Sequence, residues 1–121
     1  MTLSVSTQVS PVGTKLIKDT EANATPETNV TGAAGTLYML DIDNRGNPAD
    51  VAYLKIYDDA APTVGTSDPD FIFKVPVNQR RQIVCPDGLD FAALSFAVVT
   101  APGTPGTTDP TNPVIVQMVT S

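Results

Sequence analysis

Apolar and polar side chains alternate along most of this chain, and the alternation predicts β-strands. The clearest case is residues 51–58, where Ala52, Leu54 and Ile56 share one face and Tyr53, Lys55 and Tyr57 share the other. A period of two, with β-branched and aromatic residues between turn-forming segments, is typical of a strand. We expect 51–58 to be the central strand of a sheet, with one face packed in a core.

The same pattern predicts further strands at residues 2–9, 14–18, 35–43, 71–77, 79–85, 94–100 and 114–119. The turn Asn44-Arg45-Gly46-Asn47-Pro48 should join 35–43 to 51–58 as a hairpin, because asparagine and glycine allow positive φ. Pro76 lacks an N–H, so the strand 71–77 should lie at a sheet edge or end there. Inward-facing positions give a predicted core of Leu40, Leu54, Ile56, Phe73, Phe96, Val98 and Val116.

The segments between these strands are rich in turn-forming residues. We expect a polar surface loop at 19–28, a loop at 59–70 and a turn at Pro86-Asp87-Gly88. Residues 101–113 contain several prolines and glycines, and they should form a long exposed loop that reaches outward.

Composition supports a single all-β domain over residues 1–121. Eleven prolines and eight glycines leave little room for helix, and a hydrophobic fraction of 41% is enough for a core. We therefore predict an all-β protein, an antiparallel β-sandwich of about eight strands. Jelly-roll and immunoglobulin-like strand orders both fit the pattern, and residues 1–10 are either an extended arm or an edge strand.

Charge and cysteine content exclude several classes of function. The net charge of −6 would repel a phosphate backbone, so we expect no nucleic-acid partner. No apolar run is long enough for a membrane helix, and the N-terminus does not resemble a signal peptide. The single cysteine, Cys85, follows an apolar run and is interpreted as a small buried hydrophobic residue.

Candidate catalytic and metal-binding groups are few. The chain has no histidine, which removes the usual serine and cysteine triads and histidine-ligated zinc. The segment Asp41-Ile42-Asp43-Asn44-Arg45-Gly46 departs from an EF-hand loop, because Arg45 occupies a ligand position and no glutamate follows Gly46. Asp58-Asp59 and Asp68-Pro69-Asp70 are interpreted as solvated loop acids. We predict that the protein is not an enzyme and binds no metal or cofactor.

One stretch is similar to a known family. Ala52-Tyr53-Leu54-Lys55-Ile56-Tyr57-Asp58, with the following Ala61-Pro62-Thr63-Val64-Gly65-Thr66-Ser67-Asp68-Pro69, resembles a pattern in small virion structural proteins of tailed bacteriophages, including phages of cyanobacteria. The similarity extends over roughly residues 36–119, with Phe96-Ala97-Val98-Val99-Thr100 as a later match. Residues 78–82 depart from the pattern, which has a glycine-rich turn and small residues there.

The resemblance implies a capsid decoration (cement) protein, made in the host cytoplasm and located on the capsid surface of the virion. Its implied partners are the major capsid protein and further copies of itself, with a homotrimer favoured. Candidate interface residues are the apolar face of the N-terminal strand and the one basic doublet: Leu3, Val5, Val9, Arg80 and Arg81. The alternatives are a head–tail or tail accessory protein and, from another class, a carbohydrate-binding module presenting Tyr53, Tyr57 and Phe73.

Overall fold

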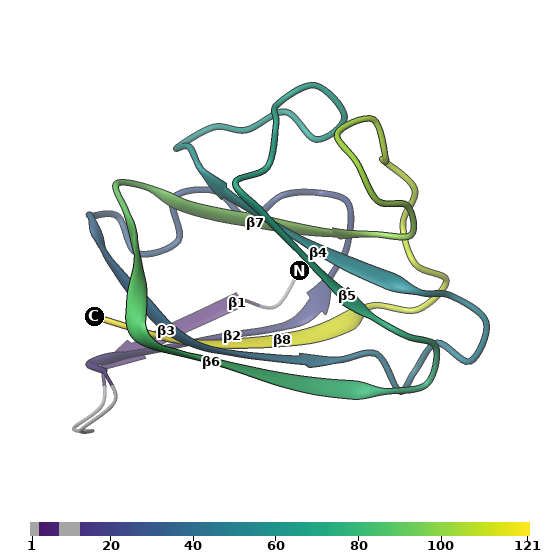
Figure 1. The fold of residues 1–121 in the computed structure, drawn as a ribbon, viewed down its shortest axis with the longest axis horizontal. Helices are drawn as coiled ribbons and strands as arrows, with labels where there is room; N and C mark the ends of the chain where they lie inside the picture. The colour runs from purple at the N-terminus through teal and green to yellow at the C-terminus, as the bar shows by residue number, and fades with distance from the viewer. Residues whose placement is uncertain (1–2, 8–12) are drawn as a thin grey trace.

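The computed structural model describes residues 3–7 and 13–121, and it confirms the all-β sandwich (Figure 1). Eight strands form two antiparallel sheets: a five-stranded sheet in the order β1-β2-β8-β3-β6 and a three-stranded sheet in the order β5-β4-β7. The strands are β1 (Leu3–Thr7), β2 (Lys15–Ala22), β3 (Gly35–Asp43), β4 (Ala52–Asp58), β5 (Phe71–Val75), β6 (Arg80–Phe91), β7 (Leu94–Val99) and β8 (Val114–Thr120).

The core lies between the sheets, and β4 is the central strand of the smaller one, as predicted. Leu54 of β4 is opposite Phe73 of β5 on one side and Val98 of β7 on the other. Six of the seven predicted core residues are buried, and the seventh, Phe73, is partly buried and packs against them. The period-two pattern therefore identified the inner faces correctly.

The other face of β4 is covered as well. Lys55 is fully buried, and its Nζ donates hydrogen bonds to the carbonyl oxygens of Thr104 at 3.3 Å and Gly106 at 2.9 Å. Burial lowers the pKa of Lys55. The loop 101–113 is largely exposed, as predicted, but it does not simply reach outward. Its carbonyls turn back onto β4, where they supply the acceptors that a buried ammonium needs.

The predicted hairpin between 35–43 and 51–58 was also wrong, because β3 and β4 belong to different sheets. The connection between them carries two buried asparagines. Asn47 Nδ2 donates to Asn44 Oδ1 at 2.9 Å and to the Asn112 carbonyl at 2.8 Å, and Asn44 Nδ2 donates to the Asp50 carbonyl at 2.8 Å. The amides thus hold a crossover from one sheet to the other rather than a tight turn.

Residues 19–28 are not a surface loop. Strand β2 continues to Ala22 with a register shift after Asp19, and the following residues run beside β7. Backbone hydrogen bonds join Val98 N to Asn23 O at 2.9 Å, Glu27 N to Phe96 O at 2.9 Å and Val30 N to Leu94 O at 2.8 Å. Segment 23–30 therefore covers an edge of the smaller sheet that would otherwise be open.

The predicted turn at Pro86-Asp87-Gly88 lies inside β6, which is longer than expected. The pairing of β3 with β6 shifts between Leu37 and Met39, so residues 85–88 form an irregularity opposite Tyr38. Gly88 has a φ of 76° there. The turn-forming residues accommodate extra chain within the strand, as in a β-bulge, instead of ending it.

Candidate interaction surface

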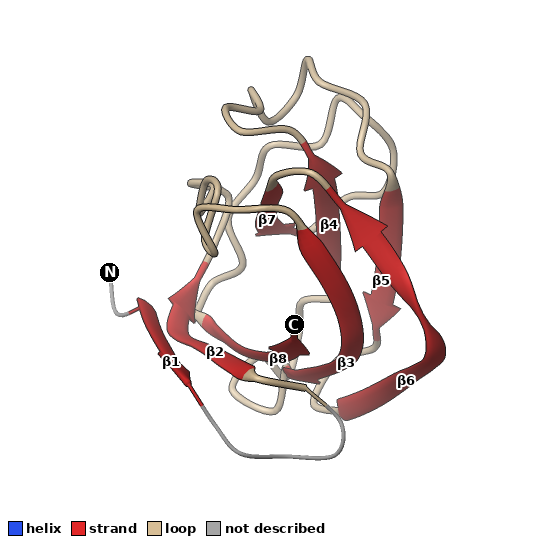
Figure 2. Cartoon of the chain, turned by 90° about the vertical axis from the view of Figure 1, so that its left-hand side faces the viewer, coloured by secondary structure: helices blue, strands red, loops and turns tan. Residues whose placement is uncertain are grey.

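Two outer strands, β5 and β6, lie on the same side of the sandwich, opposite the side that carries β1 (Figure 2). Each belongs to a different sheet and has a strand partner on one side only. Pro76 correctly marked β5 as an edge strand, since β5 ends at Val75. We name the outward side chains of β5, β6 and the connection 76–79 the open-edge surface.

The open-edge surface exposes most of the large apolar side chains that the described residues leave in solvent. Phe71 is 42% exposed, Ile72 39%, Val77 37% and Val84 63%; the fifth, Val5, lies on β1. The rings of Phe71 and Phe73 stack with centroids 6.3 Å apart. The period-two pattern aligns Phe71 and Val77 with Phe73, a predicted core residue, and it gives no sign that Phe71 and Val77 are exposed.

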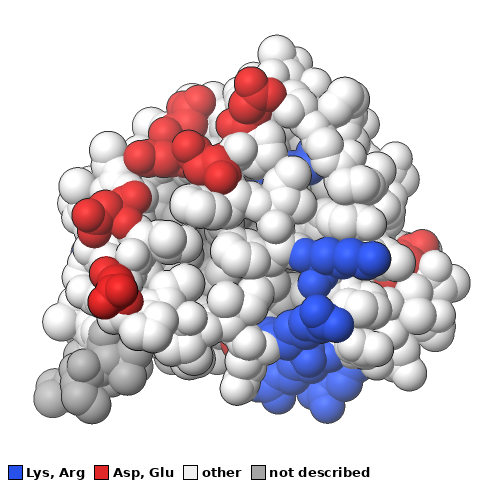
Figure 3. Space-filling model, in the orientation of Figure 1, with Lys and Arg blue, Asp and Glu red and all other residues white. Residues whose placement is uncertain are grey.

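One end of the open-edge surface is basic. Lys74 lies near the end of β5, and Arg80 and Arg81 begin β6 only a short connection later. In Figure 3, lysine and arginine side chains gather in a blue cluster at the lower right of the face shown. Within residues 3–7 and 13–121, neither Lys74 nor Arg81 forms an ion pair.

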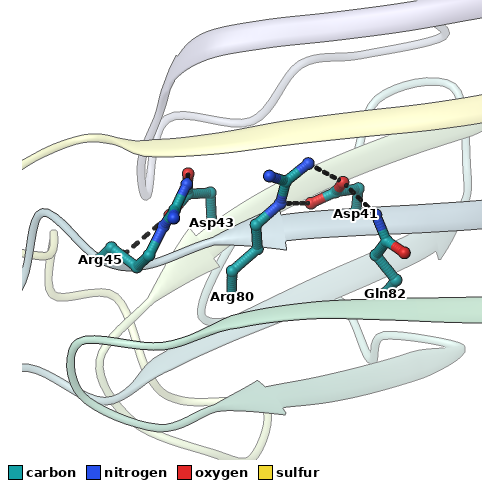
Figure 4. Close-up of polar contacts among 5 residues, drawn as sticks. All are labelled: Asp41, Asp43, Arg45, Arg80 and Gln82. Carbon is teal, nitrogen blue, oxygen red and sulfur yellow. Dashed lines mark hydrogen bonds and ion pairs between the residues drawn. The ribbon is translucent and has the colours of Figure 1, made fainter.

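Arg80 differs from Arg81 because it is already engaged (Figure 4). Its Nε lies 2.8 Å from Asp41 Oδ1 and its terminal nitrogen contacts Oδ2, which also accepts a bond from Gln82 Nε2 at 3.0 Å. These bonds hold the pKa of the largely buried Asp41 carboxyl below its ordinary value. Of the predicted basic doublet, Arg81 is therefore the residue available to a partner.

The second aspartate of the segment 41–46, which was compared with an EF-hand loop, is also paired with an arginine. Arg45 donates to both carboxylate oxygens of Asp43, at 3.0 and 2.9 Å, which lowers the pKa of Asp43. Both aspartates of this segment are thus paired with arginine side chains. The part of the chain that the structure describes contains no group of three or more acidic or cysteine side chains placed to hold a metal ion.

The other end of the open-edge surface is acidic. Asp58, Asp70 and Asp90 line a small cavity that is open to solvent, together with apolar side chains that include Phe71 and Leu89. Asp70 Oδ2 accepts the Asp58 N–H at 2.6 Å, and Asp58 Oδ1 accepts the N–H groups of Ala92 and Ala93 at 2.8 and 3.0 Å. Asp58 and Asp70 thus join separate backbone segments, and none of the three carboxylates takes part in an ion pair among the described residues.

The other predicted interface residues lie on the far edge. Strand β1 pairs with β2, placing Leu3 opposite Asp19 and Val5 opposite Ile17. Leu3 is partly buried against the core, whereas Val5 is 41% exposed. Val9 lies outside the described residues. The structure therefore separates Leu3 and Val5 from the basic doublet, on opposite sides of the sandwich.

The proposed sugar platform is incomplete. Tyr57 is fully buried, so its ring cannot stack on a ligand, while Tyr53 and Phe73 are partly buried. Cys85 is also only partly buried, which corrects its interpretation as a core residue.

Two carboxyl groups lie in the interior on the β2 side. Asp19 is fully buried opposite Val116; its Oδ1 accepts the Glu21 N–H at 2.9 Å, and its Oδ2 has no hydrogen-bond partner among the described residues. Burial raises the pKa of Asp19. Burial and the nearby Asp19 charge also raise the pKa of Glu27.

We expect Asp19→Asn to stabilise the protein at neutral pH, because the amide keeps the acceptor for Glu21 and removes a buried charge. In the wild type, the folded state holds the Asp19 proton more tightly than the unfolded chain, so lowering the pH through the raised pKa adds stability. The advantage of the variant should therefore shrink toward the ordinary pKa of 3.8. Urea unfolding between about pH 4 and pH 8 measures this. A difference that stays constant or grows in acid would contradict it; Asp87→Asn, at an exposed carboxylate, is the control.

The described residues form strands and loops, and none of them forms a helix long and apolar enough to cross a membrane. No protein-family model, curated protein or solved structure matches this chain.

Proposed function

We propose that this chain is a structural protein of a tailed-bacteriophage virion, namely a decoration protein that binds the outer capsid surface and stabilises the shell. The observation that carries the proposal is the open-edge surface, where four large apolar side chains are exposed on β5, β6 and the connection between them, with a basic and an acidic end. Several large apolar side chains exposed near charged groups are typical of sites of protein–protein contact. Self-association belongs to the proposal, as the family resemblance implies.

The strand order is compatible with a jelly roll. With segment 23–30 counted beside β7, the layers are β2-β8-β3-β6 and 23–30-β7-β4-β5, and β1 extends the first. Jelly rolls occur in viral capsid and lectin domains. The order therefore suits both a virion protein and a carbohydrate-binding module, and the choice between them depends on the surface.

Surface chemistry favours a protein partner. A sugar platform needs exposed rings, and the burial of Tyr57 removes one of the three candidates. The open-edge surface instead combines aliphatic side chains, the Phe71 ring and unpaired charges, which is the composition of a protein interface with an apolar centre and a polar rim.

The test is sedimentation of the purified protein with expanded capsids that lack decoration protein, from a panel of tailed phages that includes phages of cyanobacteria. We expect saturable binding to at least one capsid. Val84→Lys should weaken that binding about tenfold or more, because it places a charge in the apolar part of the surface. Val5→Lys is the matched control, an exposed valine on the opposite edge, and it should bind normally.

Binding to none of the capsids would overturn the proposal. Binding to purified tails or head–tail connectors instead would assign the protein to a tail accessory role, and binding to a glycan array would assign it to the carbohydrate class.

A further inference from the structure

The sandwich has four outer strand edges among its described residues, and they are not equivalent. The edge of β7 is covered by segment 23–30. Strand β1 exposes mainly serine and threonine, and β6 carries two arginines, Pro86 and an irregular register. Charges, proline and bulges are the devices by which proteins keep an edge from pairing.

Strand β5 lacks most of these devices. It pairs with β4 without a register shift, and its only charged residue is Lys74. Phe71 and Ile72 are both exposed on it. A regular edge strand with exposed apolar side chains is suited to accept another strand.

The charges around β5 specify the direction of such pairing. Asp70 comes directly before β5 and Lys74 lies near its end, so the strand has an acidic start and a basic finish. Strand β6 repeats this polarity in space, with Arg81 beside the basic end and Asp90 at the cavity of the acidic end. In a parallel arrangement of two copies, like charges would face each other. An antiparallel arrangement brings each acidic end to the basic end of the other copy, where opposite charges attract.

We propose that β5 pairs with β5 of a second copy of this chain in an antiparallel, two-fold symmetric dimer, with the basic end of each open-edge surface opposite the acidic end of the other. The surface is then self-complementary, as an isologous interface requires. The pairing closes on itself, so it gives a dimer rather than the trimer that the family resemblance implies. The dimer does not depend on capsid binding. Because it buries β5, it leaves the outward face of β6, where Val84 is 63% exposed, for the capsid.

Sedimentation equilibrium is the first test, with an expected mass of twice the 12.7 kDa chain. The double variant Lys74→Glu/Arg81→Glu should raise the dimer dissociation constant at least about tenfold, because like charges then face each other at both ends. Added salt should weaken the wild-type dimer. The control is Lys18→Glu, the same charge change at an exposed lysine of β2, and it should leave the dimer unchanged.

A mixing experiment tests the pairing directly. Lys74→Glu and Asp90→Lys should each dimerise weakly alone, whereas an equal mixture should form heterodimers with an affinity closer to that of the wild type. In the mixture, each altered end meets an end of opposite charge. Circular dichroism establishes that both variants are folded.

Hydrogen exchange identifies which strand forms the dimer interface. Amides of residues 71–75 should become more protected as protein concentration rises, and those of β1 should not. The proposal is overturned by a wild-type chain that remains monomeric at about 1 mM, by a trimer, by protection that appears in β1, or by mixtures that gain no affinity.

Discussion

Replacing Leu54 with alanine should lower the free energy of unfolding by about 2–5 kcal/mol. Leu54 is fully buried on β4, with strand partners on both sides and the larger sheet across the core. Removing its side chain loses burial and leaves a cavity that a strand held on both sides cannot close. Urea or thermal unfolding followed by circular dichroism measures the loss.

The comparison variant is Val84→Ala, which shortens an apolar side chain that is 63% exposed. It should change the free energy by no more than about 0.5 kcal/mol. A cost below about 1 kcal/mol for Leu54→Ala would mean that β4 is not central to the core.

A second large effect is expected at Gly88, within the irregular part of β6. A Cβ atom there would clash with Thr36 Cγ2 and lie 3.2 Å from Tyr38 Cε1, and the φ of +76° disfavours any side chain. The left-handed backbone costs about 1–2 kcal/mol and the overpacking about 1–3 kcal/mol, so Gly88→Ala should destabilise by about 2–5 kcal/mol.

Gly32→Ala separates these two contributions. Gly32 has a similar φ of +68°, but a Cβ atom there would have nothing within 4 Å. The backbone cost alone, about 1–2 kcal/mol, is expected. Equal losses of stability in both variants, measured by the same unfolding experiment, would show that Thr36 moves aside freely and that β6 is not tightly held at the irregularity.

Local alternation predicted much of the fold because it depends only on which residues face a core. Strand β3 has the predicted bounds, and β4, β7 and β8 differ from prediction by one residue at an end. Alternation does not determine which strands are neighbours. Asn44 and Asn47 have the composition of a tight turn, yet their side chains serve as buried hydrogen-bonding groups, and only the tertiary structure distinguishes these uses.

Local sequence also failed to predict how turn-forming residues and one buried carboxylate are used. Pro86 and Gly88 signal a turn, but opposite a long β3 they are accommodated inside a continuous strand. Asp19 marked the expected end of a strand because carboxylates are seldom buried, and the structure nevertheless places it in the interior.

The open-edge surface could be predicted only in part. Pro76 indicated that β5 is an edge strand, and Arg81, a candidate contact from the sequence, forms no ion pair among the described residues. The exposure of Phe71 and Ile72 depends on β5 having no second neighbour, which is a property of the assembled sheets. The engagement of Arg80 depends on its register with Asp41 across two strands distant in sequence.

The position of β8 affects how this protein can fold during synthesis. Residues 114–120 fill the gap between β2 and β3, so Lys15 pairs with Thr120 and Leu37 pairs with the same residue from the other side. Until residue 120 has left the ribosome, β2 and β3 lack the strand that joins them, and the larger sheet remains in two parts. Pairing between strands far apart in sequence is slow, because the intervening chain loses conformational entropy before the new contacts stabilise it. The edges of β2 and β3 that β8 later covers are therefore exposed in the nascent chain, and the larger sheet can close only after residues 114–120 have been made.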